Sequence, residues 1–103
     1  MNKVLVLSKG TGQAKAFERV AVAHTEKNNI PIEWIFALGT EMEEVLSNKD
    51  IAVVIIAPEL MLVEKKIKEE LDSIKVPYIT LKPVDFGLKN MAKIMPQIEP
   101  HLK

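Results

Sequence analysis

Blocks of apolar residues alternate along the chain with segments in which apolar and polar residues recur periodically. Continuous apolar runs at 4–7 and 51–56 predict strands that are covered on both faces, as in a parallel sheet. A more mixed segment at 30–37, with Pro31 at its entrance, predicts another strand. The fourth strand is expected at 77–81, so the sequence predicts four strands separated by longer segments.

Between these strands, apolar residues recur every three or four positions, a spacing that predicts helices. The first helix is expected from Gln13 to about Lys27. A short second helix is expected after Thr40, which fits a capping box with Glu43, and is expected to end at 47–50. The third is expected over 60–74, with an inward stripe of Leu60, Val63, Ile67, Leu71 and Ile74. Glu64 and Lys68 should pair on its wet face.

The end of the chain is expected to form one more helix. A turn around Pro83 and Gly87 should lead into it. Its buried side should then consist of Leu88, Met91, Ala92 and Met95, and Pro96 and Pro100 should fray its end.

Strands that alternate with helices predict an α/β fold, a three-layer sandwich in which helices flank a four-stranded parallel sheet. Right-handed crossovers and a first helix on the opposite side from the later ones give the order 2-1-3-4, a flavodoxin-like or Rossmann-like arrangement. We expect residues 1–103 to form one domain. Binding then belongs at the carboxyl ends of the strands, where the loops after strands one and three meet.

The loop after the first strand is the strongest candidate for chemistry. Ser8 to Gly12 joins a strand to a helix and contains two glycines. Such a loop can aim backbone N–H groups at one point, which the positive end of the helix dipole also faces. The loop therefore predicts a P-loop-like phosphate cradle formed by Lys9, Gly10, Thr11, Gly12 and Gln13.

Other interpretations of this loop remain open. A dinucleotide fingerprint would need glycine or alanine at Lys15, and a Walker A loop would need Gly-Lys-Ser/Thr where Gly12-Gln13-Ala14 stands. A flavin site would need more hydroxyl residues in the loop and more aromatic residues. A tight turn without any ligand also fits the pattern.

Composition narrows the function further. Lys and Arg (14) balance Asp and Glu (14), which argues against a nucleic-acid binder that relies on a positive field. Without cysteine, the chain can form neither disulfides nor thiolate metal sites, and we expect no metal and no cofactor. The sequence contains no signal peptide pattern and no membrane-length apolar run, so we expect a cytoplasmic protein.

Several conspicuous residues are better explained by packing or solvation than by chemistry. His24 lies on the apolar stripe of the first helix, and Trp34 lies in the second strand; both are expected to pack against the core. The acidic run 41–44 and the lysines of 65–68 are expected to be solvated helix faces.

The run from Lys3 to Ala14 resembles the start of the lactose/cellobiose-type IIB components of the bacterial sugar phosphotransferase system. In that family a short strand precedes Cys-x-Gly-x-Gly; here Ser8 takes the cysteine position, and Gly10 and Gly12 match the glycines. Ile55-Ile56-Ala57-Pro58-Glu59 is similar to the end of the family's third strand, which typically reads small residue, proline, glutamine. Phe86-Gly87 is a weaker match to an aromatic-glycine pair.

The resemblance implies a phosphocarrier. In the family, the cysteine accepts a phosphoryl group from a histidine of the IIA protein and passes it to sugar held by the membrane component IIC. By this resemblance Ser8 marks the acceptor position, and Ala57, Pro58 and Glu59 form the opposite wall. The partners would be IIA and IIC, the sugar would be met only indirectly, and phosphate would be the transferred group.

Serine at position 8, in place of the family's cysteine, changes the activity that the resemblance implies. A serine hydroxyl has a far higher pKa than a thiol, and no base is evident nearby in the sequence, so transferase activity is not expected of the chain as written. Ser8 fits an engineered replacement, a native residue of a silent paralogue, or a reactive group. The alternative function is a non-catalytic IIB-like module that docks on a IIA, IIC or regulatory partner.

Overall fold

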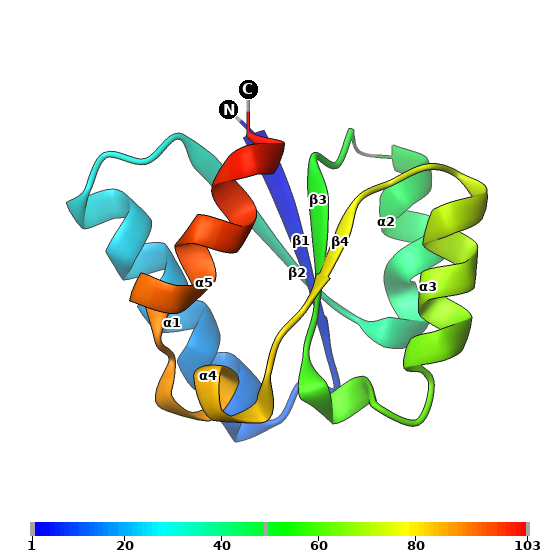
Figure 1. The fold of residues 1–103 in the computed structure, drawn as a ribbon, viewed down its shortest axis with the longest axis horizontal. Coiled ribbons are helices and arrows are strands. Elements are labelled where there is room, and N and C mark those ends of the chain that lie inside the picture. The colour runs from blue at the N-terminus through cyan, green and yellow to red at the C-terminus, as the bar shows by residue number, and fades with distance from the viewer. Residues whose placement is uncertain (1, 49, 103) are drawn as a thin grey trace.

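The computed structural model describes residues 2–48 and 50–102, with a four-stranded parallel sheet at the centre (Figure 1). The strand order is β2-β1-β3-β4, which confirms the predicted topology. The strands are β1 (Asn2–Ser8), β2 (Ile32–Leu38), β3 (Val53–Ile56) and β4 (Tyr78–Thr80). Strands β2 and β3 begin two residues later than predicted, and β4 is shorter at both ends.

Helices cover both faces of the sheet, so the predicted three-layer sandwich is confirmed (Figure 1). One layer contains α1 (Gly12–Lys27), α4 (Pro83–Leu88) and α5 (Met91–Ile98). This differs from the expectation that all later helices lie opposite the first, because β4 is the last strand of the sheet and the helices after it pack on the face that α1 covers. The other contains α2 (Met42–Asn48) and α3 (Glu64–Ser73). Short 3₁₀ turns η1 (Gly39–Glu41), η2 (Pro58–Leu60) and η3 (Glu99–His101) complete the chain.

The continuous apolar pattern of the central strands follows from this double cover. In β1, Val4 and Val6 pack against the layer of α1, α4 and α5, while Leu5 and Leu7 pack against the layer of α2 and α3. All four side chains are buried, two on each face of the sheet. Between Val4 and Leu7, neither face of the strand accepts a polar residue, and Ser8 follows where the strand reaches the carboxyl edge of the sheet.

The first helix is fixed at both ends of its buried face. Phe17 is fully buried and stacks on Phe86 of α4 with ring centroids 5.2 Å apart. Near the other end, the buried Thr25 hydroxyl accepts a hydrogen bond from Trp34 Nε1 at 3.0 Å. Trp34 is only partly buried, at the margin of the core, and His24 is also partly buried. These contacts set the position of α1 and hence of the loop that precedes it.

The third helix differs from its prediction at both ends. Residues 58–63 form η2 and a turn, so α3 begins at Glu64 rather than at about Leu60. Val63 (45% exposed) and Ile74 (53% exposed) therefore lie outside the buried stripe, to which Ile67 and Leu71 belong. Leu60 is buried although it belongs to the 3₁₀ turn. The helical spacing of apolar residues therefore extends in the sequence beyond the start of α3, which explains the early predicted start.

The end of the chain also differs from its prediction. The expected turn around Pro83 and Gly87 is the helix α4, which begins at Pro83, because a proline at the first helical position needs no hydrogen-bond partner for its nitrogen. The last helix starts at Met91, leaves Leu88 and Ala92 exposed, and includes Pro96 instead of ending at it. Its buried residues are Met91, Ile94, Met95 and Ile98.

The second helix has a different cap from the predicted one. The carboxylate of Glu41, not that of Glu43, accepts a hydrogen bond from the backbone N–H of Leu38 at 2.7 Å. The 3₁₀ turn η1 occupies the position where Thr40 was expected to cap α2. Met42 is buried, and Val45 and Leu46 pack against the same core cluster.

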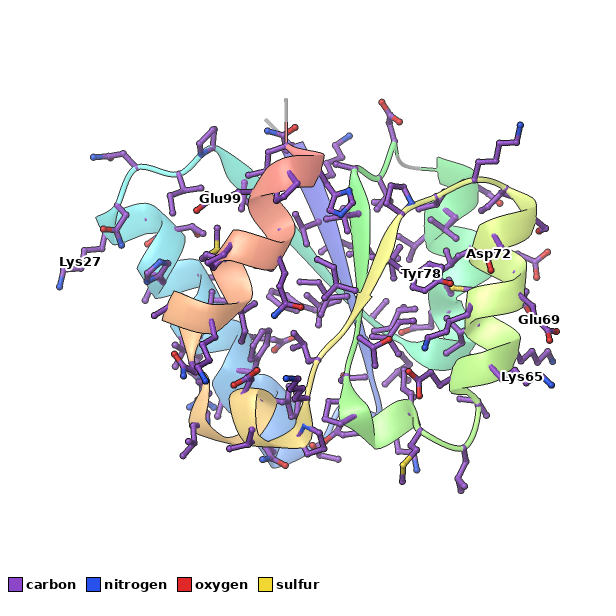
Figure 2. All side chains as sticks on the ribbon, viewed as in Figure 1. Lys27, Lys65, Glu69, Asp72, Tyr78 and Glu99 are labelled. Atoms are coloured by element: carbon purple, nitrogen blue, oxygen red, sulfur yellow. The ribbon has the colours of Figure 1, made fainter. Side chains whose placement is uncertain are left out.

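The outer face of α3 is solvated as predicted. Figure 2 shows Lys65 and Glu69 pointing away from the sheet, while Tyr78 of β4 lies toward Asp72. The Tyr78 hydroxyl donates to Asp72 Oδ2 at 3.4 Å, and desolvation, helped by the Asp72 charge, raises the pKa of Tyr78.

Glu64 and Lys68 form the predicted pair at 2.9 Å. The hydrogen bonds from Lys68 and then Thr80 lower the pKa of Glu64.

Candidate functional site

The loop between β1 and α1 lies at the carboxyl edge of the sheet, and a cap and a glycine determine its shape. Thr11 is the N-cap of α1, where its Oγ1 accepts a hydrogen bond from the backbone N–H of Ala14 at 3.2 Å. Gly10 has φ +70°, a left-handed conformation that other residues rarely adopt. A Cβ at this position would lie 3.0 Å from Leu38 Cδ2, so the glycine also permits close packing against the end of β2.

Ser8 is half-buried at the last position of β1. Its Oγ accepts a hydrogen bond from the backbone N–H of Gly10 at 3.1 Å, which ties the side chain to its own loop. Both histidines lie toward the opposite end of the sheet, His24 in the last turn of α1 and His101 in η3 beside the C-terminus (Figure 1). Neither histidine is therefore placed to remove a proton from Ser8.

Glu59, which follows β3, contacts the β1–α1 loop directly. The backbone N–H of Lys9 donates to Glu59 Oε1 at 3.0 Å, and the Thr11 hydroxyl donates to Glu59 Oε2. Both oxygens of one carboxylate thus bind donors from the loop. The structure therefore brings together the loops after β1 and β3, as the predicted strand order implied. The carboxylate of Glu59 binds the loop at which the sequence predicted a phosphate.

The neighbours of Glu59 hold it in this place. Ala57 is buried, and its backbone N–H donates to the carbonyl of Leu7 at 3.0 Å. Pro58 starts η2, which is closed by a hydrogen bond from the Leu60 N–H to the Ala57 carbonyl at 3.0 Å. The predicted opposite wall, Ala57 to Glu59, is therefore a short, well-connected segment beside the loop.

Gly12 and Gln13, the two remaining residues of the predicted phosphate cradle, have different surroundings. Gly12 is the first residue of α1, and a Cβ added there would meet no atom within 4 Å. The Gln13 side chain lies against α4, where its Nε2 would be 3.1 Å from a Cβ on Gly87. Gln13 therefore contributes to the contact between α1 and α4 with its side chain, not to the contact with Glu59.

A cleft of about 730 Å³ adjoins Ser8 and Lys9 on the side of α2 and α3. Its lining comes from β1, the end of β2, α2 and the segment from η2 to α3. The apolar lining residues are Leu38, Met42, Leu60, Val63 and Ile67, and the charged ones are Lys9, Glu43, Lys66 and Glu70. No local pattern in the sequence indicates this cleft, because its residues are spread over separate segments.

Exposed apolar side chains line this cleft at Leu38 and Val63, and two more lie between its lining residues Leu60 and Val63 in the chain. Met61 (72% exposed) and Leu62 (91% exposed) follow η2 immediately, and Val63 and Leu38 are also exposed. We call these four residues the apolar rim. A single exposed leucine is ordinary, but three consecutive exposed apolar residues form a patch of the kind that interaction surfaces present.

The described residues include no group of three or more His, Cys, Asp or Glu that could hold a metal ion. Over the same part of the chain, no helix has the length and apolarity needed to cross a membrane.

Comparison with known proteins identifies the fold. No family model matches the sequence, and no curated protein matches it either. The structure is similar to that of the lactose-specific IIB component domain of the phosphoenolpyruvate:carbohydrate phosphotransferase system from Streptococcus pneumoniae, with a TM-score of 0.78. The match covers 99% of this chain and 98% of that chain at 12% sequence identity. The resemblance seen in the sequence is thereby confirmed at the level of the fold.

Proposed function

We propose that this chain is a IIB-like domain of the sugar phosphotransferase system that docks on partner proteins and, as written, does not carry phosphate. Its fold supports the IIB-like assignment, since the likeness to the lactose-specific IIB domain extends over both chains. Phosphate carriage is a separate matter, because it depends on the chemistry of the loop rather than on the fold.

The observation that carries the proposal is the carboxylate of Glu59 on the β1–α1 loop. It engages the Lys9 N–H and the Thr11 hydroxyl, two of the donors that a phosphoryl group would need. A phosphoryl group brings about two negative charges at neutral pH. A phosphoryl group on the loop would lie close to the negative charge of Glu59, and the Lys9 N–H and Thr11 hydroxyl would already be bound to that carboxylate. Both effects disfavour a phosphorylated state.

Ser8 weakens phosphate acceptance independently. In the mechanism implied by the resemblance, a cysteine thiolate attacks the phosphorus of a phosphohistidine; the S–P bond forms, the N–P bond breaks, and the imidazole takes up a proton. A serine hydroxyl is a poor nucleophile unless a base removes its proton. Ser8 Oγ accepts a hydrogen bond from Gly10, and both histidines lie at the other end of the sheet.

The apolar rim supports docking as the retained activity. Leu38 and Val63 line the cleft that adjoins Ser8 and Lys9, and Met61 and Leu62 directly precede Val63, so a protein that covers this cleft would also bury part of the apolar rim. By the resemblance, we propose a lactose-type IIA protein as the partner and a membrane IIC component as a second one. This role would place the chain in the cytoplasm, with no nucleic acid and no direct sugar contact.

The test is binding of a purified lactose-type IIA protein, measured by calorimetry for the chain and for two variants. Leu62→Asp places a charge in the apolar rim and should weaken binding at least about tenfold, which corresponds to 1.4 kcal/mol. Ile74→Asp is the control, because Ile74 is similarly apolar and exposed but caps the far end of α3. Equal losses in both variants, or no binding by the unmodified chain, would contradict the proposal.

A second candidate function is phosphate carriage by a form of this domain with cysteine at position 8. The conformation of the loop favours it, because Gly10 adopts a left-handed conformation and Thr11 caps α1. Under this alternative the Ser8→Cys variant alone would accept phosphate from IIA.

A further inference from the structure

We infer that Glu59 is an internal latch, an anion supplied by the chain itself that closes the β1–α1 loop to anions from solution. The inference deepens the proposed function by naming what keeps phosphate away from the β1–α1 loop, and it rests on that function only for its biological meaning. The latch itself is a property of the isolated chain and can be measured there.

The contact joins two loops at the point where the sheet changes its winding direction. Glu59 lies 50 residues from Lys9 and 48 from Thr11, so the bonds connect the crossover after β1 with the crossover after β3. One donor is a backbone N–H and the other is a hydroxyl that also caps α1. The carboxylate is therefore recognised by the same types of donor that bind phosphate in strand-loop-helix sites.

The carboxylate is held over the loop by the segment that carries it. Pro58 begins η2, and the Leu60 N–H closes this turn onto the Ala57 carbonyl at 3.0 Å. Ala57 and Leu60 on either side are buried. Little reorganisation is therefore needed to keep Glu59 in place, whereas an anion from solution would lose its free motion on binding.

Glutamine at this position should release the latch without changing its size. In Glu59→Gln the negative charge is lost and one of the two carboxylate oxygens becomes an amide nitrogen, which cannot accept a hydrogen bond from the donor that this oxygen now binds. The loop would then present at least one unengaged donor to solvent and no like charge beside it. An anion of phosphate size should bind there.

The contact could instead be only a structural brace between the two crossovers. The two explanations agree that removing Glu59 loosens the loop, but they differ in how the loop responds to added anion. A latch leaves behind a site that binds phosphate, and a brace leaves behind a loop that does not.

The test is a titration of the isolated chain with inorganic phosphate at constant ionic strength, followed through the backbone amide signals of Lys9, Gly10 and Thr11 by NMR. For Glu59→Gln we expect saturable shifts at these amides and an affinity at least tenfold higher than that of the unmodified chain. Glu70→Gln is the control, because Glu70 lines the neighbouring cleft and its loss also removes one negative charge. It should behave as the unmodified chain does.

Two results would overturn the inference. One is equal phosphate affinity in the unmodified chain and in Glu59→Gln, which would mean that the carboxylate does not compete with the anion. The other is absence of saturable binding in both Glu59→Gln and Glu59→Ala while their spectra remain those of a folded protein, which would make the contact a brace. Neither result depends on IIA binding, so failure of the latch and failure of the proposed docking function are separable.

Discussion

At the scale of single residues, the loop after β1 depends on one backbone conformation and one distant carboxylate. Gly10 supplies the positive φ, and Glu59 supplies the charge that the loop binds. The first was expected from the sequence, because glycine is the residue that adopts such a turn without strain. The acidic charge of Glu59 was evident in the sequence as well, but its direction was not, since nothing local tells whether a residue after a strand faces its own helix or a neighbouring loop.

Replacing Gly10 with alanine should lower the free energy of unfolding by about 1–2 kcal/mol, the usual cost of a left-handed conformation for an L-residue. The new methyl group would also press on Leu38, which lies 3.0 Å from the Cβ position. Urea unfolding followed by circular dichroism measures the change. Gly12→Ala is the matched control and should be neutral or slightly stabilising, because its site is open and helical. Equal destabilisation by both would contradict this account of the loop.

At the scale of elements, the sequence predicts which segments form strands and helices better than it predicts where they end. The continuous runs of β1 and β3 are diagnostic because both sheet faces are buried. The start of α3 was misplaced because buried Leu60 kept the apolar spacing going through a 3₁₀ turn. Pro83 and Gly87 predict a turn because both residues favour turns, whereas the structure has the helix α4 there, packed against α1 through Phe86.

The packing of α1 against α4 predicts a large effect of truncating Phe17. This ring is fully buried and stacks on Phe86, so Phe17→Ala should cost about 3–5 kcal/mol of unfolding free energy. Chemical denaturation measures it, with Val84→Ala on the exposed side of α4 as the control. A loss below about 1 kcal/mol for Phe17→Ala would mean that α4 does not pack on α1 as described.

On α3, the pair of Glu64 and Lys68 predicts a small pH-dependent contribution to stability. The folded state lowers the pKa of Glu64 below its ordinary value of 4.5. The stabilisation is therefore complete above that value and is lost as the pH falls through the folded pKa. Glu64→Gln should lower the free energy of unfolding by about 0.3–0.5 kcal/mol near neutral pH, as for other exposed helical pairs.

Urea unfolding at neutral and acidic pH tests this prediction. The difference between Glu64→Gln and the unmodified chain should shrink toward zero as the carboxyl becomes protonated. Glu69→Gln on the outward face of α3 is the control and should show a smaller effect (Figure 2). A difference that grows on acidification would contradict the assigned sign.

At the scale of the whole molecule, strand order places the loops that follow β1 and β3 at one edge of the sheet. The sequence predicted this order and the residues of both loops, since alternation of strand and helix restricts the topology. It did not predict the cleft or the apolar rim, which form only when β2, α2 and the start of α3 come together. The fold therefore follows from local pattern, whereas the cleft and the apolar rim follow from tertiary structure.

We propose that this domain keeps a IIB-like scaffold in which Ser8 and the Glu59 latch together prevent phosphate carriage. The most direct measurement is intact mass after incubation with phosphoenolpyruvate, the general phosphotransferase proteins and a lactose-type IIA protein. We would compare the unmodified chain, Ser8→Cys, and Ser8→Cys combined with Glu59→Gln, with a lactose-specific IIB domain as the positive control.

We expect no added phosphoryl group on the unmodified chain and little on Ser8→Cys. The combined variant should carry the most, because it has both a thiol at position 8 and a loop that the Glu59 carboxylate no longer occupies. Phosphorylation of the unmodified chain at Ser8 would contradict this proposal. So would an unmodified mass for the combined variant under conditions in which the positive control is phosphorylated and the variant still binds the IIA protein.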